Sequence, residues 1–171
     1  LVFLSVASVF GQNLDYEKIA PHPRLLLKSG DITAIKEFAA QSPNGQKIHN
    51  LIITEADKML TEAPVERQMT GRRLLSISRK ALKRIFYLSY AYITTEDMRY
   101  ATRAEKEMLA ICEFEDWNPS HFLDVGEMTM ALAIGYDWLY RQLPVHSRSI
   151  IGTAIYEKGL RPSENNSHAW F

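Results

Sequence analysis

Three side chains that could take part in acid–base chemistry lie in the most apolar stretch of the chain. His121, Asp124 and Glu127 follow one another at intervals of three residues. On a helix this spacing places side chains on one face, and Trp138 continues the same stripe further along. Such a face could look into a polar cleft that holds a ligand. The structural alternative is that the two acids serve the first turns of the helix, where the dipole favours negative charge, or pair with basic side chains of a neighbour.

The stretch that carries these residues, 117–140, has the pattern of a helix enclosed on nearly all sides. Apolar residues recur at three- and four-residue spacing, and others fill the faces between them. A helix that is apolar all round must be surrounded by other helices, and small residues such as Gly126 and Gly135 would let them approach closely. Asn118 can accept hydrogen bonds from free amides, and Pro119 has no amide to leave unpaired. The sequence therefore predicts an inner helix that begins at these two residues.

The rest of the chain after Ser29 also has helical periodicity, and no segment alternates convincingly with period two. Further helices are expected at about 31–40, 46–61, 72–93, 96–112 and 145–158. Short turns between helices favour antiparallel neighbours, which build either a solenoid or a closed toroid. The hairpins share no repeat motif of the kind that marks regular arrays. The predicted fold is therefore all-α, with antiparallel helical hairpins that form part of an incomplete (α/α) toroid.

The N-terminal residues divide into two segments before the helical domain of residues 29–171. Residues 1–11 form an apolar run that is too short to span a bilayer and is typical of a secretory signal peptide remnant. A buried N-terminal strand is the alternative for this run. Residues 12–28 are expected to be an extended lead-in, because Pro21 and Pro23 bias the residues before them away from helical angles. A periplasmic or secreted protein is expected, with no membrane contact once the signal is removed.

Composition excludes several classes of site. The 20 basic and 20 acidic residues cancel, which removes the electrostatic case for nucleic acid. A local basic cluster still leaves a polyanionic ligand open, although it could equally be a solvated helix face; it comprises Arg72, Arg73, Arg79, Lys80, Lys83 and Arg84. The single cysteine, Cys112, has no partner for a disulfide and is expected to be a core thiol. The histidines show no metal-ligand spacing, so neither metal nor cofactor is expected.

Several segments together carry a resemblance to a known family. They are HPRLLLKSGDITAIKE, LSYAYITTED, NPSHFLDVGEMTMALAIGYDWLY, QLP and EKGLRPS. These segments resemble the N-terminal part of polysaccharide lyases of the heparinase II/III and alginate lyase type, and they span nearly all of the chain after the signal. The resemblance implies an incomplete (α/α) toroid that forms one wall of a long substrate cleft and is joined to β-sandwich domains. It also implies an anionic polysaccharide as substrate, cleaved at uronic acid units by β-elimination.

Cleavage by β-elimination requires particular side chains around the uronate unit. The C5 proton of a uronate is very weakly acidic, so the charge that develops must be stabilised at the carboxylate by Asn, Gln, His or Arg. A Tyr or His takes the proton, and a Tyr protonates the leaving oxygen. The resemblance implies a neutralising residue shortly after 159–163 and a base and acid further on. Asn165 and Asn166 are candidates for the neutralising pair, or a loop before that motif. The catalytic residues are therefore expected beyond Phe171, and no turnover is expected from this chain alone.

Two other functions remain open from the sequence. One is a glycoside hydrolase with an α/α barrel, in which Asp124 and Glu127 would be the two carboxylates, although such enzymes normally draw their acids from different helices. The other is a non-catalytic helical-repeat carbohydrate-binding module with scattered aromatic residues on its concave face. Tyr87, Tyr90 and Tyr92 could stack on a sugar ring, or they could form a core edge with solvated hydroxyl groups.

Overall fold

The structure is a computed structural model that describes residues 18–164, and these residues form helices and loops without a strand. Six α-helices follow in order: α1 (Asp31–Gln41), α2 (Pro43–Met59), α3 (Leu75–Thr95), α4 (Met98–Cys112), α5 (Phe122–Trp138) and α6 (Val145–Ala154). A π-helical turn (Ile155–Leu160) and a 3-10 turn (Arg161–Glu164) continue from α6. The predicted all-α class is confirmed. The predicted signal remnant, residues 1–11, lies outside the described residues.

Helices α3 and α5 form one layer and run in the same direction. Arg79 pairs with Glu127 near the start of both helices, and Phe86 contacts Trp138 further along both. Because the residue numbers rise together, the two helices are parallel. They are the most extensively packed pair of helices in the described chain.

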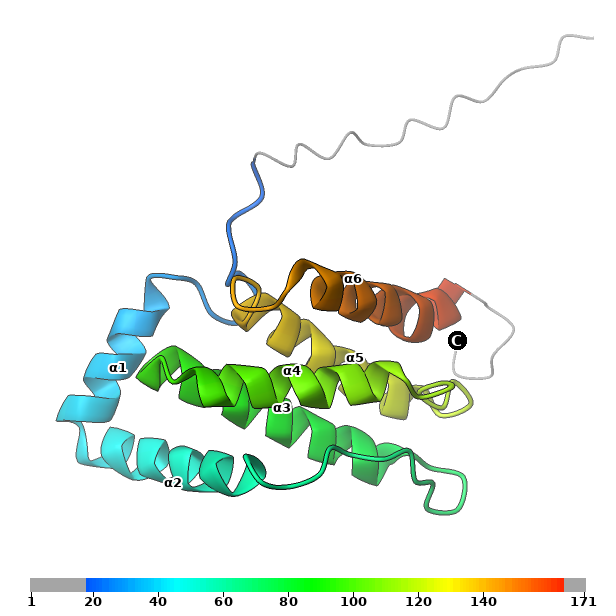
Figure 1. The fold of residues 1–171 in the computed structure, drawn as a ribbon, viewed down its shortest axis with the longest axis horizontal. Helices are drawn as coiled ribbons and strands as arrows, with labels where there is room; N and C mark the ends of the chain where they lie inside the picture. The colour runs from blue at the N-terminus through cyan, green and yellow to red at the C-terminus, as the bar shows by residue number, and fades with distance from the viewer. Residues whose placement is uncertain (1–17, 165–171) are drawn as a thin grey trace, which may run out of the picture.

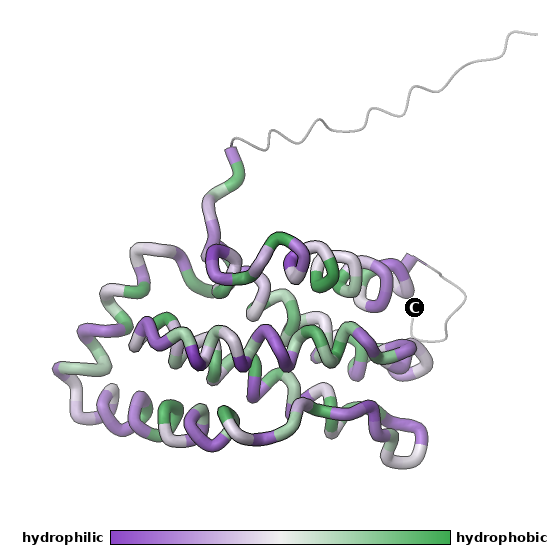
Figure 2. The backbone as a smooth tube through the Cα atoms, in the orientation of Figure 1, coloured by the Kyte–Doolittle hydropathy of each residue, from purple (hydrophilic) through white to green (hydrophobic). Residues whose placement is uncertain are grey.

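Helices α2, α4 and α6 form a second layer that runs antiparallel to the first (Figure 1). The contact of His49 with Tyr90 and that of Glu55 with Lys83 set α2 antiparallel to α3. Contacts with rising residue numbers set the second-layer helices parallel to one another: Asp57 with Tyr100, Glu62 with Arg103, Glu105 with Ser147, and Cys112 with Lys158. Figure 2 shows hydrophilic and hydrophobic residues alternating along α2 and α4, as expected for helices with one buried face.

The main core fills the space between the layers. Ile85 and Leu88 of α3 meet Met128 and Leu132 of α5 there, with Met108 of α4 closing the outer side. At Gly135 a Cβ atom would lie 2.5 Å from the Met108 sulfur and 2.6 Å from Ile85 Cγ2. Glycine is therefore required where α3, α4 and α5 meet, as the sequence predicted. Gly126 has no such neighbour within 4 Å, so the same expectation is wrong there.

The predicted start of the central helix is also wrong. Helix α5 begins at Phe122, four residues after Asn118, and Asn118 lies in the preceding turn with φ 63°. Its side-chain amide donates to the Arg72 carbonyl at 2.9 Å and to an Asp124 carboxylate oxygen at 2.7 Å. Asn118 therefore ties the loop to two distant segments instead of capping the helix.

Two further boundaries differ from the sequence expectation. Residues 42–45, expected to be a break before a helix at 46, form the first turn of α2. The Ser42 hydroxyl accepts the Gly45 amide at 3.3 Å, and Pro43 occupies the first turn, where its missing amide is harmless. The third helix starts at Leu75 instead of 72 because Arg73 and Leu74 are held in the turn by Asp124.

Candidate functional site

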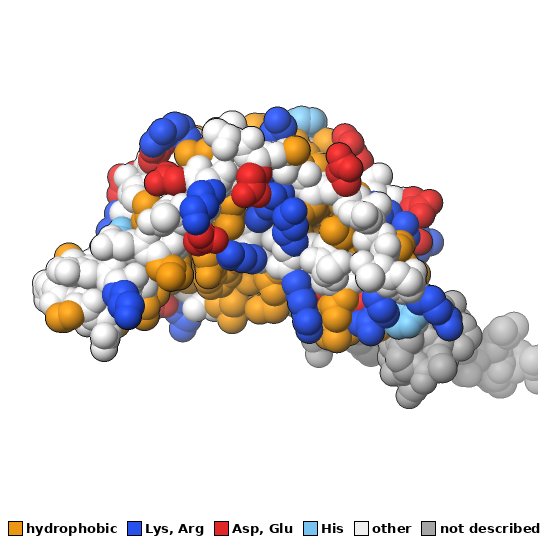
Figure 3. Space-filling model, turned by 90° about the horizontal axis from the view of Figure 1, so that it is seen from below, with side chains coloured by type: hydrophobic (Ala, Val, Ile, Leu, Met, Phe, Trp, Pro, Cys, Tyr) orange, Lys and Arg blue, Asp and Glu red, His pale blue; other side chains and the backbone are white. Residues whose placement is uncertain are grey.

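The second layer leaves one face of α3 and α5 without cover, and we call this the uncovered face. On α3 it presents the half-buried side chains Leu82 and Phe86 at helical spacing, and both also pack against the smaller buried cluster around Trp138. On α5 Leu123 is 54% exposed and Met130 is 47% exposed. Seen from below, hydrophobic side chains gather where the outline of the molecule is hollowed (Figure 3). The prediction that α5 is enclosed on all sides is thus correct for most of the helix and wrong for this stripe.

Asp124 is the most strongly held of the predicted site residues, and it is fully buried. Arg73 donates to its carboxylate from Nη2 at 2.8 Å and from Nε at 3.1 Å, while the Leu74 amide and the Asn118 side chain each donate at 2.7 Å. Burial alone raises the pKa of Asp124, but the hydrogen bonds from Arg73, Asn118 and Leu74 outweigh burial and hold that pKa below its usual range. Asp124 is therefore a structural carboxylate that joins α5 to the start of α3.

Glu127 and His121 lie near Asp124 in sequence but serve other contacts. Glu127 pairs with Arg79 across the uncovered face, with Nε 3.2 Å from each carboxylate oxygen. The ring of His121 contacts the Ser120 hydroxyl at 3.1 Å. Both acids thus pair with arginines, Asp124 with Arg73 of the turn before α3 and Glu127 with Arg79 of α3, which is the structural alternative that the sequence left open.

Trp138 lies at the opposite end of the helix from these residues. Fourteen residues separate it from Asp124, which is about 21 Å along a helix. Its indole N–H donates to the Leu25 carbonyl at 2.9 Å, and its ring packs 5.0 Å from that of Phe86. The four residues predicted to share one cleft therefore do not converge: three lie at the start of α5 and one at its end. The weak candidates Asn165 and Asn166 lie outside the described residues.

The lead-in docks onto the same end of α5 through Asp137. One carboxylate oxygen of this buried residue lies 2.5 Å from His22 Nδ1, and the other accepts the backbone amides of Arg24 and Leu25 at 2.8 Å each. The His22 ring stacks on Tyr140 with centroids 3.9 Å apart. Asp137 thus fixes a segment more than a hundred residues away in sequence.

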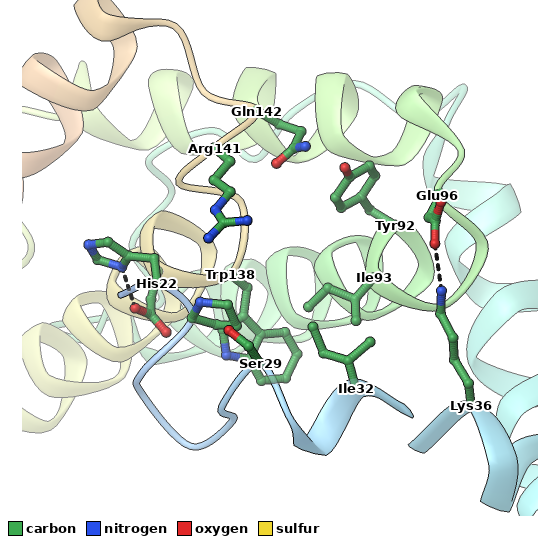
Figure 4. A pocket seen from close by; sticks show the side chains of 12 residues that line it. His22, Ser29, Ile32, Lys36, Tyr92, Ile93, Glu96, Trp138, Arg141 and Gln142 are labelled. Atoms are coloured by element: carbon green, nitrogen blue, oxygen red, sulfur yellow. Dashed lines mark hydrogen bonds and ion pairs between the residues drawn. The ribbon is translucent and has the colours of Figure 1, made fainter. Parts of the chain in front are cut away.

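A pocket of about 330 Å³ lies where the lead-in, α1 and the ends of α3 and α5 meet, and we call it the end pocket. Its lining comprises His22, Pro23, Ser29, Ile32, Lys36, Tyr92, Ile93, Glu96, Asp137, Trp138, Arg141 and Gln142. In Figure 4, Arg141 and Gln142 reach over the pocket from the turn after α5, while Ile32 and Lys36 come from α1 on the other side. Trp138 and Ile93 form its apolar floor.

Most charges around the end pocket are already paired. Lys36 Nζ lies 2.7 Å from Glu96, and this contact lowers the pKa of the Glu96 carboxyl. The carboxylate of Asp137 is occupied by His22 and two amides of the lead-in. The Arg141 guanidinium, by contrast, makes no hydrogen bond or ion pair with any residue of 18–164. The sequence reasoning missed both His22 and Arg141, because nothing local marks a histidine and an arginine that meet only after folding.

The predicted basic cluster is largely neutralised. Four of its members pair with acids: Arg73 with Asp124, Arg79 with Glu127, Lys83 with Glu55, and Arg84 with Glu62 and Glu107. It is therefore not an open polyanion site. The tyrosines also separate: Tyr87 lies beneath Lys83, Tyr90 contacts His49, and Tyr92 lines the end pocket.

Cys112 is half-buried and packs against the edge of the main core, and burial raises the pKa of its thiol to about 12. Within residues 18–164, no three His, Cys, Asp or Glu side chains are grouped as metal ligands would be. None of the helices in that range has the length and apolarity needed to cross a bilayer.

No protein-family model matches the chain. A search of curated proteins finds no match either. Membership of a lyase family therefore remains a prediction based on the sequence segments alone.

Proposed function

We propose that this chain is the N-terminal portion of a secreted polysaccharide lyase that cleaves uronic-acid-containing polysaccharide by β-elimination. In this proposal the uncovered face is one wall of the substrate cleft, and further helices complete an incomplete (α/α) toroid. The observation that carries the proposal is a face of two parallel helices that the second layer leaves free and that combines apolar and aromatic side chains. Aromatic and apolar side chains of this kind are suited to the faces of sugar rings.

The two-layer arrangement also supports the proposal. Parallel helices on one side and antiparallel partners on the other are what successive hairpins produce when they wind around an axis. The first-layer helices would then face the axis, where a long polymer could lie. The resemblance of the lead-in and of the α5 segment to lyases of the heparinase II/III and alginate lyase type supplies the reaction class.

The contacts of Asp124 and Glu127 with arginines weigh against the alternative of a glycoside hydrolase. A hydrolase needs one carboxyl group that can give up a proton and another that can act as base or nucleophile. Asp124 is buried under four donors, and Glu127 is bound to Arg79. In addition, both residues lie on one helix one turn apart, whereas such enzymes normally draw their acids from different helices.

Affinity electrophoresis tests the proposal with the whole chain. Gels that contain alginate, heparan sulfate or pectate are compared with gels that contain neutral dextran. We expect at least one uronate polymer to retard the chain and dextran to leave its mobility unchanged. Retardation by dextran alone, or by none of the polymers, would contradict the proposal.

A matched pair of variants tests whether the uncovered face is the binding wall. Met130→Glu places a negative charge on that face, whereas Ile150→Glu places one on α6 in the second layer, at a residue of similar exposure, 41%. We expect Met130→Glu to abolish retardation by the uronate polymer and Ile150→Glu to retain it. Equal losses in both variants would show that added negative charge, and not this face, decides binding.

A further inference from the structure

We propose that the end pocket binds a single carboxylated sugar unit, with the Arg141 guanidinium as the partner of the carboxylate. This proposal rests on the proposed function for the choice of a sugar as ligand. It goes further by assigning a separate subsite, at the end of the uncovered face, to residues of the lead-in and of the turn after α5.

The charge balance favours one negative charge in the ligand. Lys36 and Glu96 form an ion pair at the edge of the pocket, and both carboxylate oxygens of Asp137 are occupied by contacts with the lead-in. Arg141 is then the one cation of the lining without a partner among the described residues. A planar guanidinium binds a carboxylate through two parallel hydrogen bonds, so a monocarboxylate is the anion that fits.

The remaining lining suits a hydroxylated ring. The Tyr92 and Ser29 hydroxyl groups and the Gln142 amide make no side-chain hydrogen bond with residues 18–164 and border the apolar floor of Trp138 and Ile93. Such a combination of a few free polar groups over an apolar base is typical of small-molecule sites. The volume of about 330 Å³ is at the small end for ligand sites and therefore favours one sugar unit over a polymer segment.

The pocket is held open before any ligand arrives. Asp137 binds the amides of Arg24 and Leu25, and Leu27 is buried against Trp138 and Ile93. These contacts fix His22, Pro23 and Ser29 as one wall of the pocket. A preformed wall lowers the entropy lost on binding.

Nuclear magnetic resonance titration of the whole chain with sodium glucuronate, glucose and sodium acetate tests the proposal. The indole N–H signal of Trp138 and the side-chain amide signal of Gln142 report directly from the pocket. Arg141→Gln removes the proposed partner, and Arg72→Gln makes the same charge change at the far end of α3, about 30 Å away along a 21-residue helix. Both arginines are exposed, so both variants should fold, which circular dichroism checks.

We expect glucuronate to shift both pocket signals saturably. Arg141→Gln should weaken glucuronate binding about tenfold, the effect of losing one charge-assisted contact, without changing the response to glucose. Arg72→Gln should bind like the unaltered chain. Equal glucuronate binding by the two variants overturns the proposal, as does acetate binding as tightly as glucuronate.

The proposal and the proposed function fail separately. If uronate polymers retard the chain and Met130→Glu abolishes this, while glucuronate shifts no pocket signal, the end pocket assignment is wrong and the cleft wall stands. If glucuronate binds through Arg141 while no uronate polymer retards the chain, the pocket assignment stands and the lyase proposal is wrong.

Discussion

Replacing Asp124 by asparagine should destabilise the fold strongly, although the two side chains have nearly the same shape. The carboxylate accepts hydrogen bonds from Arg73, from the Leu74 amide and from Asn118, and it has no exposed surface. An asparagine keeps one oxygen, but its NH2 group must face at least one of these donors. A hydrogen bond to a charged group contributes about 1.5–3 kcal/mol, and an unsatisfied buried donor costs about 1–3 kcal/mol.

The loss of stability in Asp124→Asn is limited by Arg73. Its side chain is 39% exposed and can turn to solvent once its partner is gone. We therefore expect Asp124→Asn to lower the free energy of unfolding by about 2–4 kcal/mol. For a chain of this length that corresponds to a fall in the melting temperature of roughly 5–15 °C. Urea denaturation followed by tryptophan fluorescence measures the free energy.

Glu127→Gln is the matched control because Glu127 lies one turn along the same helix and also pairs with an arginine. Arg79 is 62% exposed, and a solvent-exposed ion pair contributes about 0–1 kcal/mol. The control should therefore cost less than about 1 kcal/mol. If the two variants lose the same stability, burial and hydrogen bonding do not distinguish these two acids.

The same pair of variants makes a prediction for pH. The pKa of Asp124 is lower in the folded protein than in the unfolded chain. Its ionised form thus stabilises the fold above the unfolded pKa of about 3.9, and this stabilisation is lost as the pH falls through the lower folded pKa. The stability difference between the unaltered chain and Asp124→Asn should be largest near neutral pH and should shrink below about pH 4. A difference that stays constant down to acid unfolding would contradict this assignment.

Three further predictions follow from the packing. Asp137→Asn should release the lead-in, so the amides of Arg24 and Leu25, which donate to Asp137, should exchange hydrogen at least about tenfold faster, measured by hydrogen–deuterium exchange. Gly135→Ala should cost about 1–3 kcal/mol by overpacking, whereas Gly126→Ala should add about 0.5–1 kcal/mol, measured by thermal denaturation. Cys112, whose thiol pKa is raised to about 12 by burial, should react slowly with iodoacetamide at pH 8 and rapidly in urea.

Each of these has a result that would count against it. Unchanged exchange at Arg24 and Leu25 would mean that Asp137 does not hold the lead-in. Equal effects of alanine at Gly135 and Gly126 would contradict the close approach of three helices at the former. Fast alkylation of Cys112 in the native chain would show that the thiol is accessible and not buried.

The order and type of the helices could be predicted from the sequence because periodicity is a local property. Apolar residues at helical spacing identified all six helices, and α4 ends at the predicted Cys112. The close approach of helices at Gly135 was also predicted from its small side chain, although the same expectation is wrong at Gly126. Boundaries that depend on a distant partner were missed: Asn118 has the residue type of a helix cap, yet its amide is used by Arg72 and Asp124.

The candidate site depended on the tertiary structure far more than the helices did. The sequence alone determined that the chain is helical, that its charges cancel and that Asp124 and Glu127 share one stretch of helix. Only folding decided which of these charges are occupied, because Arg73, Arg79 and the lead-in approach α5 from segments about 50 to 115 residues away. Hydrophobic periodicity reports which side of a helix is buried, but it carries no information about which charged side chain meets which. That is why the acids predicted to face a cleft are paired with arginines, and why the unpaired Arg141 was found only in the folded chain.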